Sequence, residues 1–200
     1  MTKVYKLTTQ DWYTRKGESN QCLWGPGVTH SGTGKGDLCG PGYIHAYLSP
    51  LLAVLLSPIH ANIRNPVLWE CETEIVKSDN GLKVGGISLT TIGTVSLPSV
   101  TKDQRIAFAI YCAKSVCKDQ TFNRWADDWL SGKDRSASAA WAAARSASSA
   151  ASAAAWSAWS AESPELPESA AASAAWVAAW VAESPESLLL DAAEKAMLIS

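Results

Sequence analysis

Apolar and polar residues alternate along several stretches of the first hundred residues, a pattern that predicts half-buried β-strands. The clearest is PVLWECETEIV, residues 66 to 76, where valine, tryptophan, cysteine, threonine and isoleucine alternate with a row rich in glutamate. KVYKLTT at 3 to 9, GYIHAYL at 42 to 48 and ISLTTIGTVSLP at 87 to 98 are also typical of strands. Asp79-Asn80-Gly81 predicts a turn before the last of them. We therefore expect a small mixed or antiparallel sheet.

Three other segments have features of helices. Ser49 and Pro50 supply a cap and a first-turn proline for the short apolar segment PLLAVLL. Thr101 is placed to cap an amphipathic helix that runs to Cys117, and FNRWADDWL, residues 122 to 130, spaces two tryptophans by four residues. Because the strands come first and the helices last, the fold class is α+β.

The composition changes near residues 132 to 136, beyond which alanine and serine dominate. We interpret this break as the boundary between an α+β globular domain, residues 1–135, and an Ala-rich helical tail, residues 136–200. Alanine is the residue that costs least to order in a helix. Ser-Pro-Glu occurs twice in the tail, at 163 and at 184, and indicates a helix start with a serine cap. The tail is expected to form helices over about 137–161, 168–183 and 186–199.

Five tryptophans of the tail recur at helical spacing, as in AWSAWSAESPE and AWVAAWVAESPE. A single alanine-rich helix gains little by burial, so the tail needs something to pack against. That partner is the globular domain, another tail helix or another copy of the chain, and we expect a homo-oligomer. The tryptophans argue against disorder, and a polar side of serine and glutamate argues against a membrane-surface helix. The predicted oligomerisation residues are Trp141, Trp156, Trp159, Trp176 and Trp180.

Charge and cysteine content indicate which partners and which cellular location to expect. The 200 residues carry a net charge of −2, which gives no global reason to expect a nucleic-acid or membrane partner. From Ser136 onward there are two basic and seven acidic residues, which leaves +3 on the front part. Five cysteines are an odd number, and no charged, apolar signal peptide precedes them, so a reduced, cytoplasmic location is expected. No apolar run is long enough to span a bilayer.

Functional side chains are densest between Trp24 and Pro50, among seven glycines. A glycine-rich loop with a lysine can present backbone amides and one cation to a phosphate, although SGTGKGD lacks the order of a phosphate-binding P-loop. A flexible surface loop explains the same residues equally well. The candidate ligand-binding residues are Trp24, His30, Lys35, Tyr43, His45 and Tyr47.

Tyr43, His45 and Tyr47 recur with a period of two and would project from one face of a strand. They line a ligand pocket or form part of the core. A zinc site built from His30, Cys39, His45 and His60 matches no compact ligand spacing, so no metal is expected. No catalytic residue is assigned, because the sequence has neither a nucleophile elbow nor a hydrolase triad.

Several segments together resemble a family of phage and prophage proteins with an Ala-rich repeat tail and no established activity. They are W-G-x-G-V-T-H, L-C-x-x-G-Y-I-H-A-Y, P-I-H-A-N, G-L-K-V-G and W-L-S-G-K-D-R-S. GYIHAYLSP is also similar to the G-[FY]-I-H-x-S motif of proteins with an ADP-ribosyltransferase-like fold. That resemblance implies an NAD site, with His45 or His30 in the first role. It also implies a stacking role for Tyr47 or Tyr43 and an acid at Glu70 or Glu72.

The function expected from these observations is that of a phage-type, non-catalytic and self-associating binding protein. Its ligand would be a nucleotide-like anion or a host factor. Small phage proteins that lack catalytic residues and self-associate often act on host defences, so such a role is expected here. The alternatives are an ADP-ribosyltransferase-like enzyme that uses NAD, and a structural protein that assembles through its tail. Only the enzyme alternative implies a cofactor, NAD or a related nucleotide.

Overall fold

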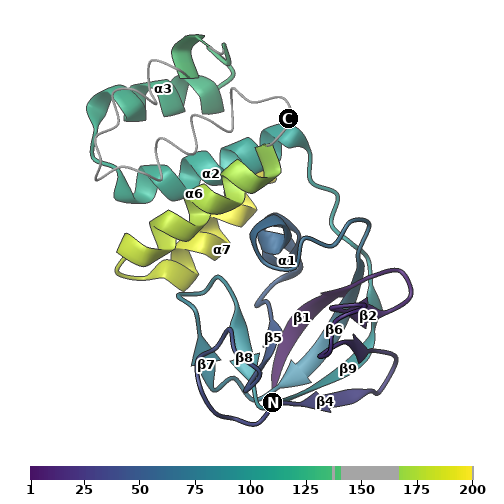
Figure 1. Ribbon diagram of the computed structural model, residues 1–200. Helices are drawn as coiled ribbons and strands as arrows, with labels where there is room; N and C mark the ends of the chain where they lie inside the picture. The colour runs from purple at the N-terminus through teal and green to yellow at the C-terminus, as the bar shows by residue number, and fades with distance from the viewer. Residues whose placement is uncertain (137, 141–166, 200) are drawn as a thin grey trace. The chain divides into compact units, whose positions relative to one another are not determined.

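The chain contains both strands and helices, as the α+β class requires, and these fall into two units. The computed structural model describes residues 1–136, 138–140 and 167–199. The units comprise Met1–Ser99 and Val100–Ser200 (Figure 1). The strands lie in the first unit, whereas the composition break near residue 135 lies inside the second.

The main sheet of the N-terminal unit has four antiparallel strands in the order β1-β6-β9-β4. Strand β1 (Thr2–Thr8) pairs with β6 (Val67–Thr73), which pairs in turn with β9 (Ser88–Val95). The short strand β4 (Thr29–Ser31) completes the sheet beside β9. The alternation in the sequence therefore predicted the three long strands correctly.

A second sheet adjoins the first at a single bridge between Tyr5 and Tyr47, whose backbones exchange two hydrogen bonds of 2.8 Å. Its order is β5-β8-β7, with β5 at Ile44–Ala46, β8 at Val84–Gly86 and β7 at Lys77–Ser78. The turn between β7 and β8 is the one predicted at Asp79-Asn80-Gly81, where the last two residues have positive φ.

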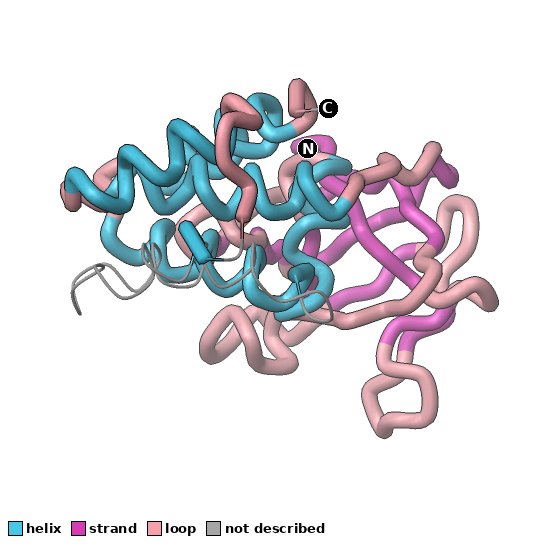
Figure 2. The backbone as a smooth tube through the Cα atoms, turned by 90° about the horizontal axis from the view of Figure 1, so that it is seen from above, coloured by secondary structure: helices cyan, strands magenta, loops and turns pink. Residues whose placement is uncertain are grey.

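Shorter elements complete this unit. Strands β2 (Tyr13–Thr14) and β3 (Cys22–Leu23) form a small hairpin. Helix α1 (Pro50–Leu56) begins as predicted, because the Ser49 side chain accepts a hydrogen bond from the Leu52 amide. A 3-10 turn, Ser57–Ile59, follows it. Much of the rest of the unit is loop, drawn pink in Figure 2.

One face of the main sheet carries the core of the N-terminal unit. Alternate residues of a strand project to the same face, so Val4 and, on the neighbouring strand, Trp69 and Cys71 point to one side. Trp24 and Ala46 pack against them in a single buried cluster. Lys6 lies two residues after Val4 in the same strand, and it therefore projects from the same apolar face of the sheet as Val4.

The C-terminal unit consists of helices. Helix α2 (Lys102–Val116) begins with a capping box, in which the Thr101 and Gln104 side chains bond each other's backbone amides. Helices α6 (Pro167–Val181) and α7 (Pro185–Ala196) lie beside α2 (Figures 1 and 2). Helix α3 (Gln120–Leu130) buries both of its tryptophans.

Alanine dominates the contact between α2 and the helices that cover it. Ala109 of α2 and Ala174 of α6 are fully buried in one cluster. Small side chains allow two helix backbones to approach closely, so the alanine content of α6 matches its packing. The predicted helices at 168–183 and 186–199 correspond to α6 and α7, whereas that at 137–161 lies mostly outside the described residues. Ser184 occupies the cap position of α7 but makes no capping hydrogen bond with its side chain, contrary to our expectation.

Candidate functional site

Lys6 places a cation on the apolar face of the main sheet. Its neighbours at the same period, Val4 and Thr8, are fully buried, and Lys6 itself is half-buried. The Lys6 ammonium donates a hydrogen bond of 2.8 Å to the His45 carbonyl oxygen and lies 4.9 Å from the centre of the Trp24 ring. One carbonyl and one aromatic face thus surround an ion that has three N–H donors.

The surroundings of Lys6 disfavour its charge. Burial lowers the pKa of Lys6 to about 8, an effect that the Cys71 and Cys22 thiols partly oppose. Among the described residues, no carboxylate lies within ion-pair distance of the Lys6 ammonium. A group with a pKa of about 8 is still mostly protonated at pH 7. Lys6 is therefore a cation without an anionic partner in the described structure.

Trp24 lies next to this cation, and His30 lies against Trp24. Trp24 is only 2% exposed, and its indole N–H donates to the Thr14 hydroxyl over 3.0 Å. The His30 ring meets the Trp24 ring edge-on, with 4.5 Å between the ring centres. Because a carbonyl can only accept, Nε2 of His30 donates to the Leu23 oxygen, 2.8 Å away. The structure thus brings two of the predicted ligand-binding residues together, Trp24 beside Lys6 and His30 against Trp24.

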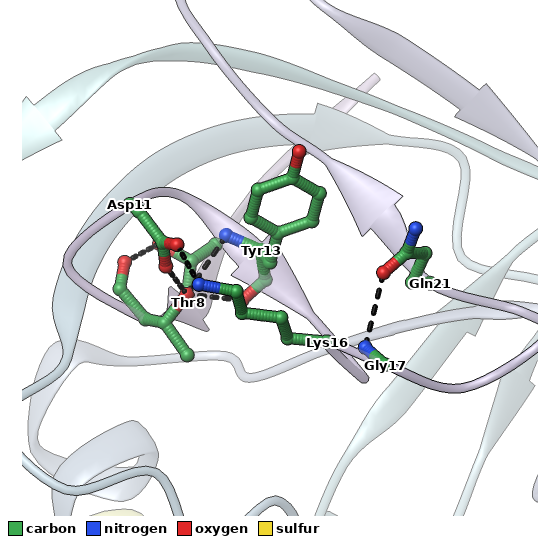
Figure 3. Close-up of polar contacts among 7 residues, drawn as sticks. Thr8, Asp11, Tyr13, Lys16, Gly17 and Gln21 are labelled. Carbon is green, nitrogen blue, oxygen red and sulfur yellow. Dashed lines mark hydrogen bonds and ion pairs between the residues drawn. The ribbon is translucent and has the colours of Figure 1, made fainter.

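Lys3, Lys16 and Lys83 of the N-terminal unit have acidic partners, whereas Lys77, like Lys6, contacts a carbonyl and an aromatic ring. Lys16 pairs with Asp11 in the turn that precedes β2 (Figure 3). Lys3 pairs with Glu70 at 3.0 Å. Lys3 lies on the same strand as Lys6, three residues before it, and its charge is neutralised by Glu70, whereas that of Lys6 is not.

The glycine-rich loop uses its backbone to hold itself in place. The Gly34 amide donates to the Gly42 carbonyl over 2.8 Å, and the Gly32 amide donates to Ile87 over 2.7 Å. The Lys77 ammonium donates to the Gly36 carbonyl over 2.6 Å. Lys35 is exposed at the surface of this loop. A phosphate cradle needs convergent free amides, whereas the amides of Gly32 and Gly34 are already bonded.

The Tyr43 and His45 side chains form hydrogen bonds to carbonyls of the same loop. The Tyr43 hydroxyl donates to the Gly34 carbonyl over 3.0 Å, and the Lys77 ammonium lies 5.0 Å from the Tyr43 ring centre. Nε2 of His45 donates to the carbonyl oxygen of Leu38. Burial lowers the pKa of His45, while the bond to the Leu38 carbonyl opposes that effect. Both side chains are therefore engaged with the protein.

The predicted ligand-binding residues are divided between the two faces of the sheet. Tyr47 pairs with Tyr5 and projects to the same face as Tyr5, because directly opposed residues of an antiparallel pair share a face. Lys6, next to Tyr5 in the strand, projects to the other face with Trp24. Tyr47 thus lies away from Trp24, and its hydroxyl contacts Nδ1 of His60 at 3.2 Å.

The acids suggested by the resemblance to ADP-ribosyltransferases also lie away from Lys6. Glu70 is paired in register with Tyr5, and Glu72 with Lys3, so both project from the face opposite to Trp69. The three histidines bond separate partners, and the described residues include no group of three or more potential ligands that could hold a metal ion.

The tail tryptophans are described only in α6. Trp176 and Trp180 are 45% and 58% exposed, with 6.0 Å between their ring centres. Trp141, Trp156 and Trp159 lie outside the described residues. The α6 pair leaves a large apolar area uncovered in the described structure.

Lys6 and its contacts were not identified from the sequence. The alternation in KVYKLTT did not signal it, because Tyr5 and Leu7 form the more apolar row and predict the opposite face as the inner one. A lysine in the row of Val4 and Thr8 is unusual, because lysine is seldom placed inside without a partner.

Comparisons with protein-family models, curated proteins and solved structures found no match. The resemblance to phage proteins and to ADP-ribosyltransferases therefore stays a prediction. Among the helices that the structure describes, none is both long and apolar enough to cross a membrane.

Proposed function

We propose that the N-terminal unit is a non-catalytic binding module for a small anionic ligand, held by Lys6 beside Trp24 and His30. The observation that carries this proposal is the Lys6 ammonium, which lies on the Trp24 ring without a carboxylate within ion-pair distance among the described residues. Placing an unpaired cation among apolar groups costs free energy, and perturbed charges of this kind concentrate at functional sites.

An anion bound at Lys6 would remove that cost. Its charge would favour the protonated form of Lys6 and would raise the Lys6 pKa from about 8. Binding should therefore be strongest below pH 8 and should weaken as Lys6 loses its proton. The half-buried His30 ring, beside the same tryptophan, gives the ligand a second polar neighbour.

Titration calorimetry at pH 7 tests the proposal with inorganic phosphate, ribose 5-phosphate, ADP-ribose and NAD as probes. Lys6→Met removes the charge and keeps most of the side-chain volume. Lys3→Met is the matched control, because Lys3 lies on the same strand but faces the other way and pairs with Glu70. We expect at least one probe to bind the wild type and Lys3→Met alike, and to bind Lys6→Met about tenfold or more weakly.

Equal affinity of Lys6→Met and wild type, or no binding of any probe to the wild type, would contradict the proposal. Release of nicotinamide from NAD, measured in the same samples, would instead support the enzyme alternative. In that case Glu70→Gln and Glu72→Gln would identify the acid involved.

Self-association through the tail is a second candidate function, favoured by the exposed pair Trp176 and Trp180. The helix that carries them has no charged residue between Glu168 and Glu183, so its exposed face can be covered without desolvating a charge. Sedimentation of the full chain should give a lower mass for the double variant Trp176→Ser/Trp180→Ser than for the wild type. Leu198→Ser, at another exposed apolar residue, is the control. A monomeric wild type would contradict this candidate.

A further inference from the structure

Trp12 has a backbone conformation that a tryptophan rarely adopts. Its φ is +67°, in the left-handed region that bulky side chains disfavour. The side chain is nevertheless 41% exposed, so burial of the whole ring does not explain the conformation. Strained backbone of this kind persists where the surrounding structure holds it, and it is concentrated at binding and catalytic sites.

A network of polar contacts in the turn around Trp12 holds it in place, and Figure 3 shows the part of it that Asp11, Tyr13 and Lys16 form. The Trp12 amide donates to the Thr9 carbonyl over 2.9 Å, and the Tyr13 amide donates to the Thr9 hydroxyl over the same distance. The Thr9 hydroxyl in turn donates to Asp11 over 2.7 Å, and Asp11 pairs with Lys16. Residues on both sides of Trp12 are thereby fixed.

The strand next to Trp12 fixes it from the other side. The Trp24 amide donates to the Trp12 carbonyl over 2.9 Å. The Trp12 ring meets the Trp69 ring edge-on, with 5.4 Å between the ring centres. Trp69 is opposite Lys6 in the register of β1 and β6. Trp12 and Lys6 therefore share two neighbours, Trp24, which Trp12 contacts through its backbone, and Trp69, which it contacts through its ring.

The accessible part of the Trp12 ring has no other occupant in the described structure. The indole N–H groups of Trp24 and Trp69 donate to Thr14 and Thr8, whereas that of Trp12 has no partner among the described residues. A fixed, accessible indole that shares the neighbour Trp69 with a lysine can accept a flat ring joined to a negative charge. Because the ring is already immobilised, a ligand would not have to order it on binding.

We propose that Trp12 is the stacking platform for a planar ring of the ligand whose anionic group Lys6 holds, so that the ligand class is that of nucleotides. This inference rests on the proposed anion site at Lys6. It assigns the affinity for the charged group to Lys6 and the preference for an attached aromatic ring to Trp12.

Two probes separate the two roles. AMP and ribose 5-phosphate carry the same phosphate and sugar, but only AMP carries a base. Titration calorimetry of the wild type should give a Kd for AMP that is roughly tenfold to a hundredfold lower than that for ribose 5-phosphate.

The variants are chosen to preserve the backbone. Asparagine tolerates positive φ and has no aromatic ring, so Trp12→Asn should keep the turn and lose the platform. Trp12→Asn should bind AMP and ribose 5-phosphate alike, with the affinity for ribose 5-phosphate unchanged. Trp12→Phe should retain most of the preference for AMP. Ile92→Asn, at another exposed apolar residue of the unit, is the control and should bind both probes as the wild type does.

The two proposals fail in different ways. If ribose 5-phosphate binds through Lys6 but AMP binds no more tightly, the anion site stands and the stacking platform is wrong. Retention of the AMP preference in Trp12→Asn would also overturn the role of Trp12. If neither probe binds the wild type, both proposals are overturned.

Discussion

The Tyr47 hydroxyl lies 3.2 Å from Nδ1 of His60, and the two rings are stacked with 5.7 Å between their centres. Burial raises the pKa of Tyr47 and lowers the pKa of His60 to about 4. Both groups are therefore neutral at pH 7, and the hydroxyl donates to the ring nitrogen. The fold holds this pair in its uncharged form.

Acid should destabilise the protein through His60. The unfolded chain has an ordinary histidine pKa near 6.5, so between pH 6.5 and 4 it binds more protons than the folded protein. The contribution is fully present above pH 6.5 and is lost as the pH falls towards 4, by roughly 3 kcal/mol at most. Urea denaturation at a series of pH values would measure it.

His60→Gln is the variant that isolates this effect, because its amide oxygen can accept the Tyr47 hydrogen bond without titrating. Its free energy of unfolding should fall less steeply between pH 6.5 and 4 than that of the wild type. Lys83 and His45 face His60 and disfavour its protonation in the same direction as burial does, and both are retained in the variant. Identical pH profiles would show that His60 does not titrate differently on folding.

Lys6→Met should stabilise the protein while weakening anion binding. The folded pKa of about 8 lies below the ordinary value of 10.5, so wild-type stability rises as the pH increases from 8 to 10.5. At pH 7 methionine removes a desolvated charge, and we expect a gain of about 1–2 kcal/mol after the loss of the hydrogen bond to His45. Urea denaturation at pH 7 and pH 10 measures the difference, which should shrink at the higher pH.

The matched variant Lys3→Met should change stability much less than Lys6→Met does, since the Lys3 ammonium is exposed and solvent screens its ion pair with Glu70. A destabilised Lys6→Met would mean that the ammonium contributes net stability through its contacts with His45 and Trp24. That result would remove the energetic basis of the proposed site.

Gly42→Ala should destabilise the N-terminal unit by about 2 kcal/mol or more, because the added methyl would overlap the carbonyl of Lys35. Gly93 is the control, since a Cβ there meets nothing within 4 Å and its φ is not positive. Gly93→Ala should be neutral or slightly stabilising. Thermal unfolding of both variants tests this comparison, and equal behaviour would contradict the packing of the loop.

Thr101→Ala should cost about 1 kcal/mol, because the Thr101 hydroxyl accepts a hydrogen bond from the Gln104 amide at the start of α2. Ser184→Ala, at the equivalent position of α7, removes no capping hydrogen bond and should lower the free energy of unfolding by only a few tenths of the Thr101→Ala loss. Urea denaturation of the two variants gives the contrast. Equal losses would show that the Ser184 hydroxyl accepts a capping hydrogen bond from a first-turn amide of α7 in solution.

Local signals in the sequence were sufficient for the elements that depend on local contacts. Ser49 and Thr101 start helices because a hydroxyl three residues before an amide can bond it without any help from the rest of the fold. The turn at Asn80-Gly81 follows from residues that tolerate positive φ. Alternation likewise predicted β1 to within one residue at each end, and the start of β6 to within one residue, whereas β6 ends three residues earlier than predicted.

The candidate site could not be predicted in the same way, because it depends on pairings between distant segments. His45 and Trp24 belong to one rich stretch of sequence, yet the bridge between Tyr5 and Tyr47 sends their side chains to opposite faces. The conformation of Trp12 is set by a turn that combines five residues, and no single one of them signals it.

The alanine contact between α2 and α6 explains how a repetitive sequence can specify one arrangement. Where Ala109 meets Ala174, the methyl group sets the spacing of two helix axes, and any larger side chain would force them apart. Such a contact tolerates exchange of alanine for serine or glycine at its margins but not enlargement at its centre. In α6 the alanine-rich sequence thus acts as a steric limit, within which one small residue can replace another but a large one cannot.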